Sequence, residues 1–399
     1  MRSQRLARAL GRHPEAGAAV GFAAVFAIFA IVVPNTFLTA NAFSSILTSQ
    51  AVPGIAAIGI TLLMVSGEFD LSVGSIMGVA SLVFLASAVS GVPVLLAIAI
   101  GLGAGALMGF VNGQLLIRTG IPSFIVTLGT LLVYRAICLT SISGGRIVRW
   151  ADYSRENPLV TLPVPLVLLI ALGLAALLAW ICGAAWREAT TSRRRLLPAL
   201  GLATGGGFTI LALVTLGPRL LDVVDVDVFH LLNGRLHLGD LGGNFRISIL
   251  WWLGLAGVFS VVLTRTRFGN ALAATGGNAA AARAQGVDID RIRVVAFTLS
   301  GLLAALAGIV QTARLKSVDP LRGEGLELEV IAAVVIGGTL LKGGYGSVIG
   351  SVIGTSLTGM LRTGLVLVGV PSNAFRGAIG ALVIVAVVIN SLVRREQDV

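Results

Sequence analysis

Apolar residues in this chain gather in long blocks that charged and turn-forming residues separate. A helix needs about 20 apolar residues to cross a bilayer, and most blocks approach that length. The pattern predicts an all-α, polytopic membrane protein with about twelve transmembrane segments. These are residues 17–33, 52–66, 72–90, 92–117, 123–142, 163–182, 196–216, 247–263, 294–313, 328–341, 345–361 and 375–392. Two of them, 52–66 and 328–341, are short, which indicates tilted, extended or broken helices.

The composition supports a membrane protein and excludes the main soluble classes. Hydrophobic residues make up 56% and charged residues 12% of the 399 residues, whereas soluble domains carry about 25% charged residues. Disordered chains are poor in apolar residues, and transmembrane β-strands alternate apolar and polar positions, so neither class fits the blocks. The 51 glycines exceed the usual share of about 7% and indicate close packing between helices.

The net charge of +11 does not indicate nucleic-acid binding, because the basic residues lie in short loops between apolar blocks. In such loops they determine how the chain is oriented in the membrane. Loops rich in Arg and Lys stay in the cytoplasm. This places both termini inside with the basic segment 265–293, and it places the acidic loop 217–246 outside. We expect one transmembrane domain over residues 1–399, with first helices at 17–142, a further pair at 163–216 and last helices at 294–392.

No motif of an enzyme or a metal site is present in the sequence. The patterns GxxxxGK[ST], HExxH and GxSxG are missing. The three histidines do not form a ligand set, and Cys138 and Cys182 lie in separate apolar blocks. We therefore expect no catalytic site, metal or cofactor in this chain, and any ATP that drives it must be bound by another protein.

Two parts of the chain share an order of small and polar residues. Glycine recurs at every fourth position in both, at Gly105, Gly109 and Gly113 and again at Gly346, Gly350 and Gly354. In the predicted topology these helices run in opposite directions, which indicates an inverted repeat of the kind found in many transporters. Glycine at this spacing is also common in packed membrane helices, so coincidence stays open as an alternative.

Several polar side chains lie within or beside apolar segments. Asp70 and Ser72 can cap the helix that follows them, or they can face an aqueous route. Asn112 lies inside an apolar helix, where its amide needs a partner. Arg135 also lies within an apolar helix. Its side chain can extend to the membrane surface, pair with an acid or line an aqueous route. The acids Glu324, Glu327 and Glu329 favour a solvated helix start.

The largest predicted inside loop is alanine-rich, with glycine breaks. Residues 268–293 therefore predict one or two short helices at the membrane surface. A plain amphipathic helix on the lipid surface is the alternative.

Short motifs of glycine, polar and small residues are spread along the chain. They are Glu68-Phe-Asp70-Leu-Ser-Val-Gly-Ser75, Asn112-Gly113, residues 122–128, Phe268-Gly269, Gly276-Gly-Asn278, Ala281-Ala282, Gly286-Val287 and residues 336–347. Together these motifs resemble the membrane permeases of ribose-, xylose- and arabinose-type ABC importers, from about Ala51 to Ile389. Phe69 and Asn270 depart from residues that are common in that family, which weakens any inference about the sugar.

The resemblance implies a ten-helix core, with residues 163–216 as a two-helix insertion similar to that of the longer xylose-type permeases. It implies two copies of this chain around one pathway in the bacterial inner membrane, and a soluble binding protein that delivers a monosaccharide, with pentoses first. It also implies a separate ATPase subunit that binds ATP and Mg. The residues expected at the pathway or gate are Asp70, Ser72, Asn112 and Thr127.

In that family the segment matching residues 268–287 docks on the ATPase, and its residues here suit the task. Two glycines allow a sharp turn before a short helix that Asn278 can cap, and alanines keep the helix thin. Arg283 offers a charge to the partner, and Gly286 can end the helix. The residues expected to couple the two subunits are Gly276, Gly277, Asn278, Ala281, Ala282, Arg283 and Gly286.

The resemblance therefore implies a permease subunit that imports a monosaccharide, with xylose or another pentose as the expected substrate and hexoses or other small polyols still open. Two alternatives stay open. One is an ion-coupled secondary transporter of a small polar solute, although few acids lie at mid-helix depth. The other is a membrane scaffold that has no role in transport.

Overall fold

The computed structural model describes residues 14–142, 145–153, 156–166, 222–236 and 242–371, with some further positions in 168–179 and 374–384. It divides into two compact units, the first comprising Met1–Glu156 with Leu232–Val399 and the second Asn157–Leu231. Half of the predicted segment 163–182, most of 375–392 and all of 196–216 lie outside the described residues.

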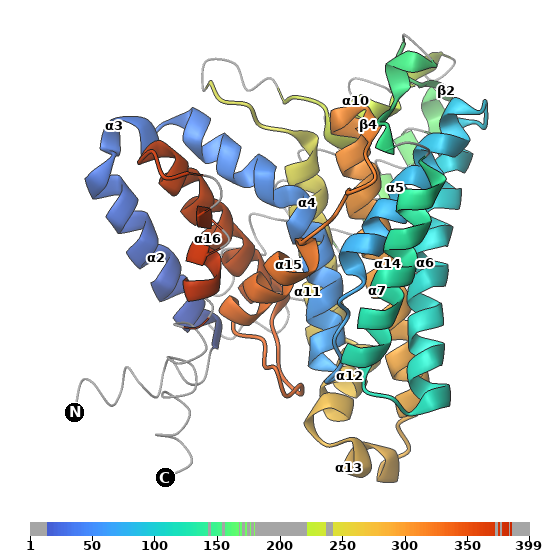
Figure 1. The fold of residues 1–399 in the computed structure, drawn as a ribbon, viewed down its shortest axis with the longest axis vertical. Helices are drawn as coiled ribbons and strands as arrows, with labels where there is room; N and C mark the ends of the chain where they lie inside the picture. Colours follow the sequence, from blue (N-terminus) through green and yellow to red (C-terminus); the bar gives the residue numbers. More distant parts are fainter. Residues whose placement is uncertain are drawn as a thin grey trace. The chain divides into compact units, whose positions relative to one another are not determined.

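The helices follow most of the predicted apolar blocks (Figure 1). Five of the described helices, α4, α6, α7, α11 and α14, are long and apolar enough to cross a membrane, and α2 and α5 contain shorter apolar stretches. They support a polytopic helical membrane protein, and the count of twelve segments stays a prediction. The helices are α2 Pro14–Val32, α3 Pro34–Phe37, α4 Ala40–Val65, α5 Val73–Val89, α6 Val94–Thr119, α7 Ser123–Ser141, α10 Val228–Asn233, α11 Ile247–Arg265, α12 Arg267–Gly277, α13 Ala279–Ala284, α14 Ile289–Leu315, α15 Leu326–Ile336 and α16 Val348–Leu367.

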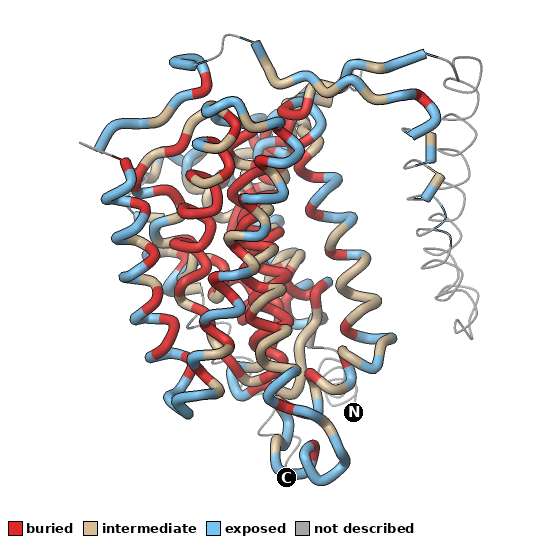
Figure 2. Tube along the Cα trace, turned by 90° about the vertical axis from the view of Figure 1, so that its right-hand side faces the viewer, coloured by how far each residue is buried: buried red, intermediate tan, exposed pale blue. Residues whose placement is uncertain are grey.

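Helix α4 is longer than predicted and lies at the centre of the first unit. It begins at Ala40 rather than at residue 52, because the Thr39 side chain caps it by accepting from the Ala42 N–H at 3.2 Å. The polar residues Thr48 and Gln50 in its first half are buried. The predicted start was wrong because these side chains face the protein interior, where α14, α16 and α11 pack around the helix. Figure 2 shows buried residues gathered in this interior.

Helices α6 and α14 approach each other along small residues. A Cβ added at Gly109 would overlap the carbonyl oxygen of Phe297, and one at Gly301 would overlap that of Gly105. Backbones this close gain many van der Waals contacts, so the predicted packing role of the α6 glycines is confirmed. Gly350 on α16 makes a similar approach to Gly337, just beyond α15. The inverted repeat itself stays a prediction.

The outward faces of α6 and α7 are apolar. Leu107 on α6 and Leu132 on α7 are 61% and 63% exposed in the single chain. Large exposed apolar surfaces are unusual on soluble monomers and are typical of proteins that face lipid or another subunit. This surface agrees with the membrane location expected from the composition.

Within the described residues, four short strands form two antiparallel pairs that the all-α prediction did not include. In the first unit, β1 (Val148–Arg149) pairs with β4 (Ser317–Val318). In the second, β2 (Leu159–Pro163) pairs with β3 (Val223–Asp227) in the register Leu159 with Asp227 and Pro163 with Val223. Pro163 is therefore the end of a strand, and the described residues of the predicted segment 163–182 are helical from residue 164 on.

Candidate functional site

The connection between α4 and α5, residues 66–72, is held by a buried carboxylate. Asp70 is fully buried. Its Oδ1 accepts from the backbone N–H of Ser72 at 2.8 Å and from the Ser72 hydroxyl at 2.6 Å. Its Oδ2 accepts from the hydroxyl of Ser300, on α14, at 3.3 Å. A buried charge is stable only with such partners, so Asp70 fixes the start of α5 against α14.

Asn112 extends this arrangement across α6 and α7. Its Nδ2 donates to the Ser72 hydroxyl at 2.8 Å, and its Oδ1 accepts from the Tyr134 hydroxyl at 3.2 Å. The amide is fully buried, and both of its ends are partnered. We call Asp70, Ser72, Asn112, Tyr134 and Ser300 the junction network, which joins α5, α6, α7 and α14.

Helix α7 holds the same connection through its first turns. Thr127 accepts from the backbone N–H of Leu71 at 3.1 Å, and Ser123 accepts from that of Phe69 at 3.1 Å. The structure thus brings the four predicted pathway residues, Asp70, Ser72, Asn112 and Thr127, to one place. All four are fully buried and do not line an open route in this conformation. Asp70, Ser72 and Asn112 are joined by hydrogen bonds, whereas Thr127 contacts the backbone of the connection.

Glu68 links the connection to the segment predicted to dock. Its carboxylate lies 2.8 Å from Nε of Arg293, on the first turns of α14, and the Glu68 side chain is only 9% exposed. Burial raises the pKa of Glu68 above its ordinary value, while the nearby charge of Arg293 lowers it. The ion pair ties the end of α4 to the helix that directly follows the docking segment.

The predicted docking segment forms two helices, α12 and α13. Asn278 caps α13, since its Oδ1 accepts from the Ala281 N–H at 3.0 Å, as the sequence predicted. The helix ends at Ala284, and Gly286 adopts a left-handed φ of 82° just beyond it. Ala281 and Arg283 are exposed, whereas Ala282 is buried against the chain itself. The docking role of these residues stays a prediction.

Gly276 has a different role from the predicted turn. It belongs to the last turn of α12, where a Cβ would overlap the Val65 carbonyl oxygen and lie 2.5 Å from the Gly344 nitrogen. The Gly344 N–H donates to the Val65 carbonyl at 2.9 Å. We call this meeting of Gly67, Gly276, Gly343, Gly344 and the Val65 carbonyl the glycine contact. It joins α12 to the α4–α5 and α15–α16 connections.

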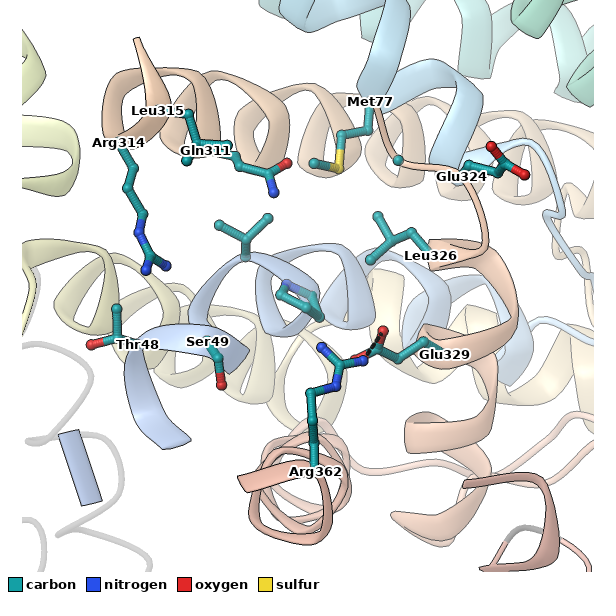
Figure 3. A pocket seen from close by; sticks show the side chains of 13 residues that line it. Thr48, Ser49, Met77, Gln311, Arg314, Leu315, Glu324, Leu326, Glu329 and Arg362 are labelled. Carbon is teal, nitrogen blue, oxygen red and sulfur yellow. Dashed lines mark hydrogen bonds and ion pairs between the residues drawn. The ribbon is translucent and has the colours of Figure 1, made fainter. Parts of the chain in front are cut away.

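A pocket that sequence reasoning missed lies among α4, α5, α14, α15 and α16 (Figure 3). Its volume is about 250 Å³. Arg362 on α16 donates to Glu329 on α15 at 2.7 Å at its edge, so the predicted solvated start of α15 is wrong for Glu329 and holds for the exposed Glu324. The pocket is lined by Thr48, Ser49, Val52, Pro53, Met77, Gln311, Arg314, Leu315, Gly323, Glu324, Leu326, Glu329 and Arg362.

Arg135 makes a contact that differs from the three uses expected from the sequence. Its Nη1 donates to the backbone carbonyl of Arg322 at 2.8 Å. Arg322 is itself buried and lies 2.9 Å from the Asp319 carboxylate. Arg135 therefore holds the chain that leads into α15 rather than lining an aqueous route.

Comparison with known proteins identifies relatives over nearly the whole chain. It is 33% identical to the xylose transport system permease protein XylH of Escherichia coli K12, over 94% of this chain and 91% of that protein. It is 31% identical to the ribose import permease protein RbsC of the same strain, over 92% and 89%. No solved structure matches the chain.

The sequence pattern of a transporter family matches residues 42–388. This family is described as "branched-chain amino acid transport system / permease component". The match contains the junction network, the glycine contact and the predicted docking segment. The resemblance to sugar-importer permeases seen in the sequence is thereby confirmed, and the chain belongs to this family of transport-system permease components.

Proposed function

We propose that this chain is the permease subunit of an ABC importer and carries a monosaccharide, xylose or another pentose, across the bacterial inner membrane. The observation that carries the proposal is the similarity over more than 90% of the chain to permeases named for xylose and ribose. The exposed, Asn278-capped α13 supports it, since a thin helix of this kind suits a cleft in another protein.

The proposal includes partners that the sequence implied. A separate ATPase subunit binds ATP and Mg and hydrolyses ATP, so this chain does no bond chemistry. A soluble binding protein delivers the sugar outside, and a second copy of the chain completes the pathway. Both termini lie in the cytoplasm, twelve segments cross the membrane with the two-helix insertion at 163–216, and the core is an inverted repeat.

Transport in this proposal needs two packings of the same helices rather than acid–base chemistry. A movement of α12 and α13 on the ATPase reaches the end of α4 through the glycine contact and reaches Glu68 through Arg293. The connection 66–72 then moves with its junction network, which holds α5, α6, α7 and α14. The buried junction network represents the closed packing in this account.

Replacing Asn112 by leucine tests the junction network. The change removes the donor to the Ser72 hydroxyl and one of two acceptors of the Tyr134 hydroxyl, whose other acceptor is the Met108 carbonyl at 3.2 Å. Each lost hydrogen bond costs about 0.5–1.5 kcal/mol, so we expect sugar uptake to fall about tenfold while the subunits still assemble. Gln114→Leu, which removes a half-buried amide on the same helix, is the control. Equal uptake in the two variants would show that Asn112 only packs between helices and has no role in transport.

Orientation is tested with single cysteines in a chain whose Cys138 and Cys182 are replaced by serine. An impermeant thiol reagent applied to intact cells should label Asp225→Cys, because Asp225 belongs to the predicted outside loop 217–246. It should label Ser192→Cys only after the membrane is opened, since Ser192 precedes the basic run at 193–195. External labelling at position 192 would contradict the twelve-segment topology.

Uptake in cells tests the proposed substrate class. The chain is expressed with the ATPase and exported binding protein of its neighbouring reading frames, in a strain that lacks its own pentose importers. We expect labelled xylose or ribose to accumulate. Leucine is the control solute, because the family description names branched-chain amino acids. Accumulation of leucine without either sugar would contradict the proposal.

A further inference from the structure

The pocket lined by Gln311 and the Glu329–Arg362 pair lies in the half of the first unit distant from the docking segment. Thr48 and Ser49 line it from the first half of α4, whereas Val65, at the other end of that helix, meets α12. Arg314 lines it from the last turn of α14, the helix that begins directly after the docking segment. The pocket is therefore on the side that the proposed orientation turns outward.

Polar groups at the pocket have unfilled hydrogen-bonding capacity. Among the described residues, Gln311 Oε1 and Glu329 Oε1 are buried and have no partner. Pro53, inside α4, has no N–H to bond the Ser49 carbonyl four residues earlier. A buried acceptor without a donor costs about 1–3 kcal/mol. Figure 3 shows Gln311 and Arg362 pointing toward the middle of the pocket from α14 and α16.

The lining matches a small neutral solute with several hydroxyl groups. Arg314 and Arg362 are balanced by Glu324 and Glu329, so the pocket does not favour an anion or a cation. Its acceptors take hydroxyl protons, and its arginines donate to hydroxyl oxygens. Met77, Val52 and Leu326 add an apolar surface for C–H groups. Pockets for drug-sized ligands measure about 300–1,000 Å³, so this volume of about 250 Å³ suits a smaller molecule.

We propose that this pocket is a transient binding site for the sugar on the external side of the pathway, and that Gln311 is one of its hydrogen-bond acceptors. The inference rests on the proposed function and adds a location and a set of contacts to it. The Glu329–Arg362 pair bridges α15 and α16 at the site, so sugar hydroxyls that compete for these groups loosen the contact between those helices. Binding there couples sugar entry to helix movement.

Uptake by a Gln311 variant tests the acceptor. Gln311→Met keeps the length of the side chain and removes the acceptor oxygen. In the complex with the ATPase and binding protein, we expect uptake of xylose or ribose at subsaturating sugar to fall about tenfold, the effect of losing about 1.4 kcal/mol. The yield of the complex should stay unchanged. Gln114→Met, outside the pocket, is the matched control.

Protection from a thiol reagent tests binding without transport. Ser49→Cys is placed in the complex with Cys138 and Cys182 replaced by serine, and labelled by an impermeant reagent without ATP. Xylose or ribose should slow the labelling of position 49, whereas leucine should not. Asn41→Cys, exposed on the first turn of α4 and outside the pocket, should label at the same rate throughout.

Failure of the pocket assignment can be distinguished from failure of the proposed function. Normal uptake by Gln311→Met, or labelling of position 49 that neither sugar slows, would overturn the pocket assignment while the unmodified complex still transports sugar. Absence of xylose and ribose uptake by the unmodified complex would overturn the proposed function, and the pocket assignment with it.

Discussion

Replacing Gly276 by alanine is expected to abolish most sugar uptake. The added Cβ would overlap the Val65 carbonyl oxygen and lie 2.5 Å from the Gly344 nitrogen, so α12 must move away from both connections. These neighbours are backbone atoms, which cannot turn aside as a flexible side chain can. Overpacking of this kind costs about 1–3 kcal/mol, and we expect uptake to fall about tenfold or more.

The neighbouring glycine provides the control. A Cβ at Gly277 meets its nearest atom, the Gly344 Cα, at 3.8 Å, which is an ordinary contact. Gly277→Ala has the same change in composition and helix propensity in the same last turn of α12. It should transport normally, as measured by initial rates of labelled xylose or ribose at matched membrane levels of the chain. Equal rates for the two alanine variants would show that the glycine contact carries no coupling.

Replacing Ala281 by tryptophan is expected to uncouple the chain from its ATPase. Ala281 is exposed on α13, so the larger side chain has room in the isolated chain and should not disturb insertion. A helix that enters a cleft cannot carry the extra ring, so the yield of the ATPase complex and sugar-stimulated ATP hydrolysis should both fall about tenfold or more. Purification through a tag on the permease, followed by ATPase assays, measures both quantities.

Ala281→Ser, a small replacement at the same position, should assemble and hydrolyse ATP normally. The comparison also separates docking from membrane binding. If α13 merely lay on anionic lipid, tryptophan would strengthen its contact with the surface, because aromatic rings favour the interface. Normal complex yield and normal stimulated hydrolysis in Ala281→Trp would refute the docking assignment.

Features that depend on neighbouring residues in the chain could be predicted from the sequence. Asn278 caps α13 because its side chain reaches an N–H only three positions away. Gly286 follows the helix end with a positive φ that glycine adopts freely. The apolar blocks gave the main helices because their length and composition determine membrane insertion. These parts of the prediction needed no knowledge of the tertiary fold.

Features that depend on distant residues could not be predicted in the same way. The start of α4 was misplaced because the apolar block begins at residue 52, and only the folded chain shows that the polar residues Thr48 and Gln50 before it are buried in the helix. Gly276 looked like a turn residue. The structure shows instead that a side chain at this position would overlap the backbone of Val65 and Gly344.

The sequence also did not show which polar residues pair with one another, because their partners lie on other helices. Asp70 and Asn112 were chosen one by one, whereas the structure joins them through Ser72. The partner of Glu329 is Arg362, on a different helix, so its place beside a pocket had no local signal. The predicted segment 345–361 ended just before Arg362, whereas α16 continues to Leu367 and includes it.

ATP-dependent uptake by purified components tests the central claim most directly. The chain and its ATPase are reconstituted in proteoliposomes with ATP enclosed at the ATPase side, and loaded binding protein is added to the opposite side. The account predicts accumulation of xylose or another pentose that requires ATP, the ATPase and the binding protein together. Accumulation by the chain alone, driven by an imposed ion gradient and unaffected by ATP, would contradict it and show a secondary transporter instead.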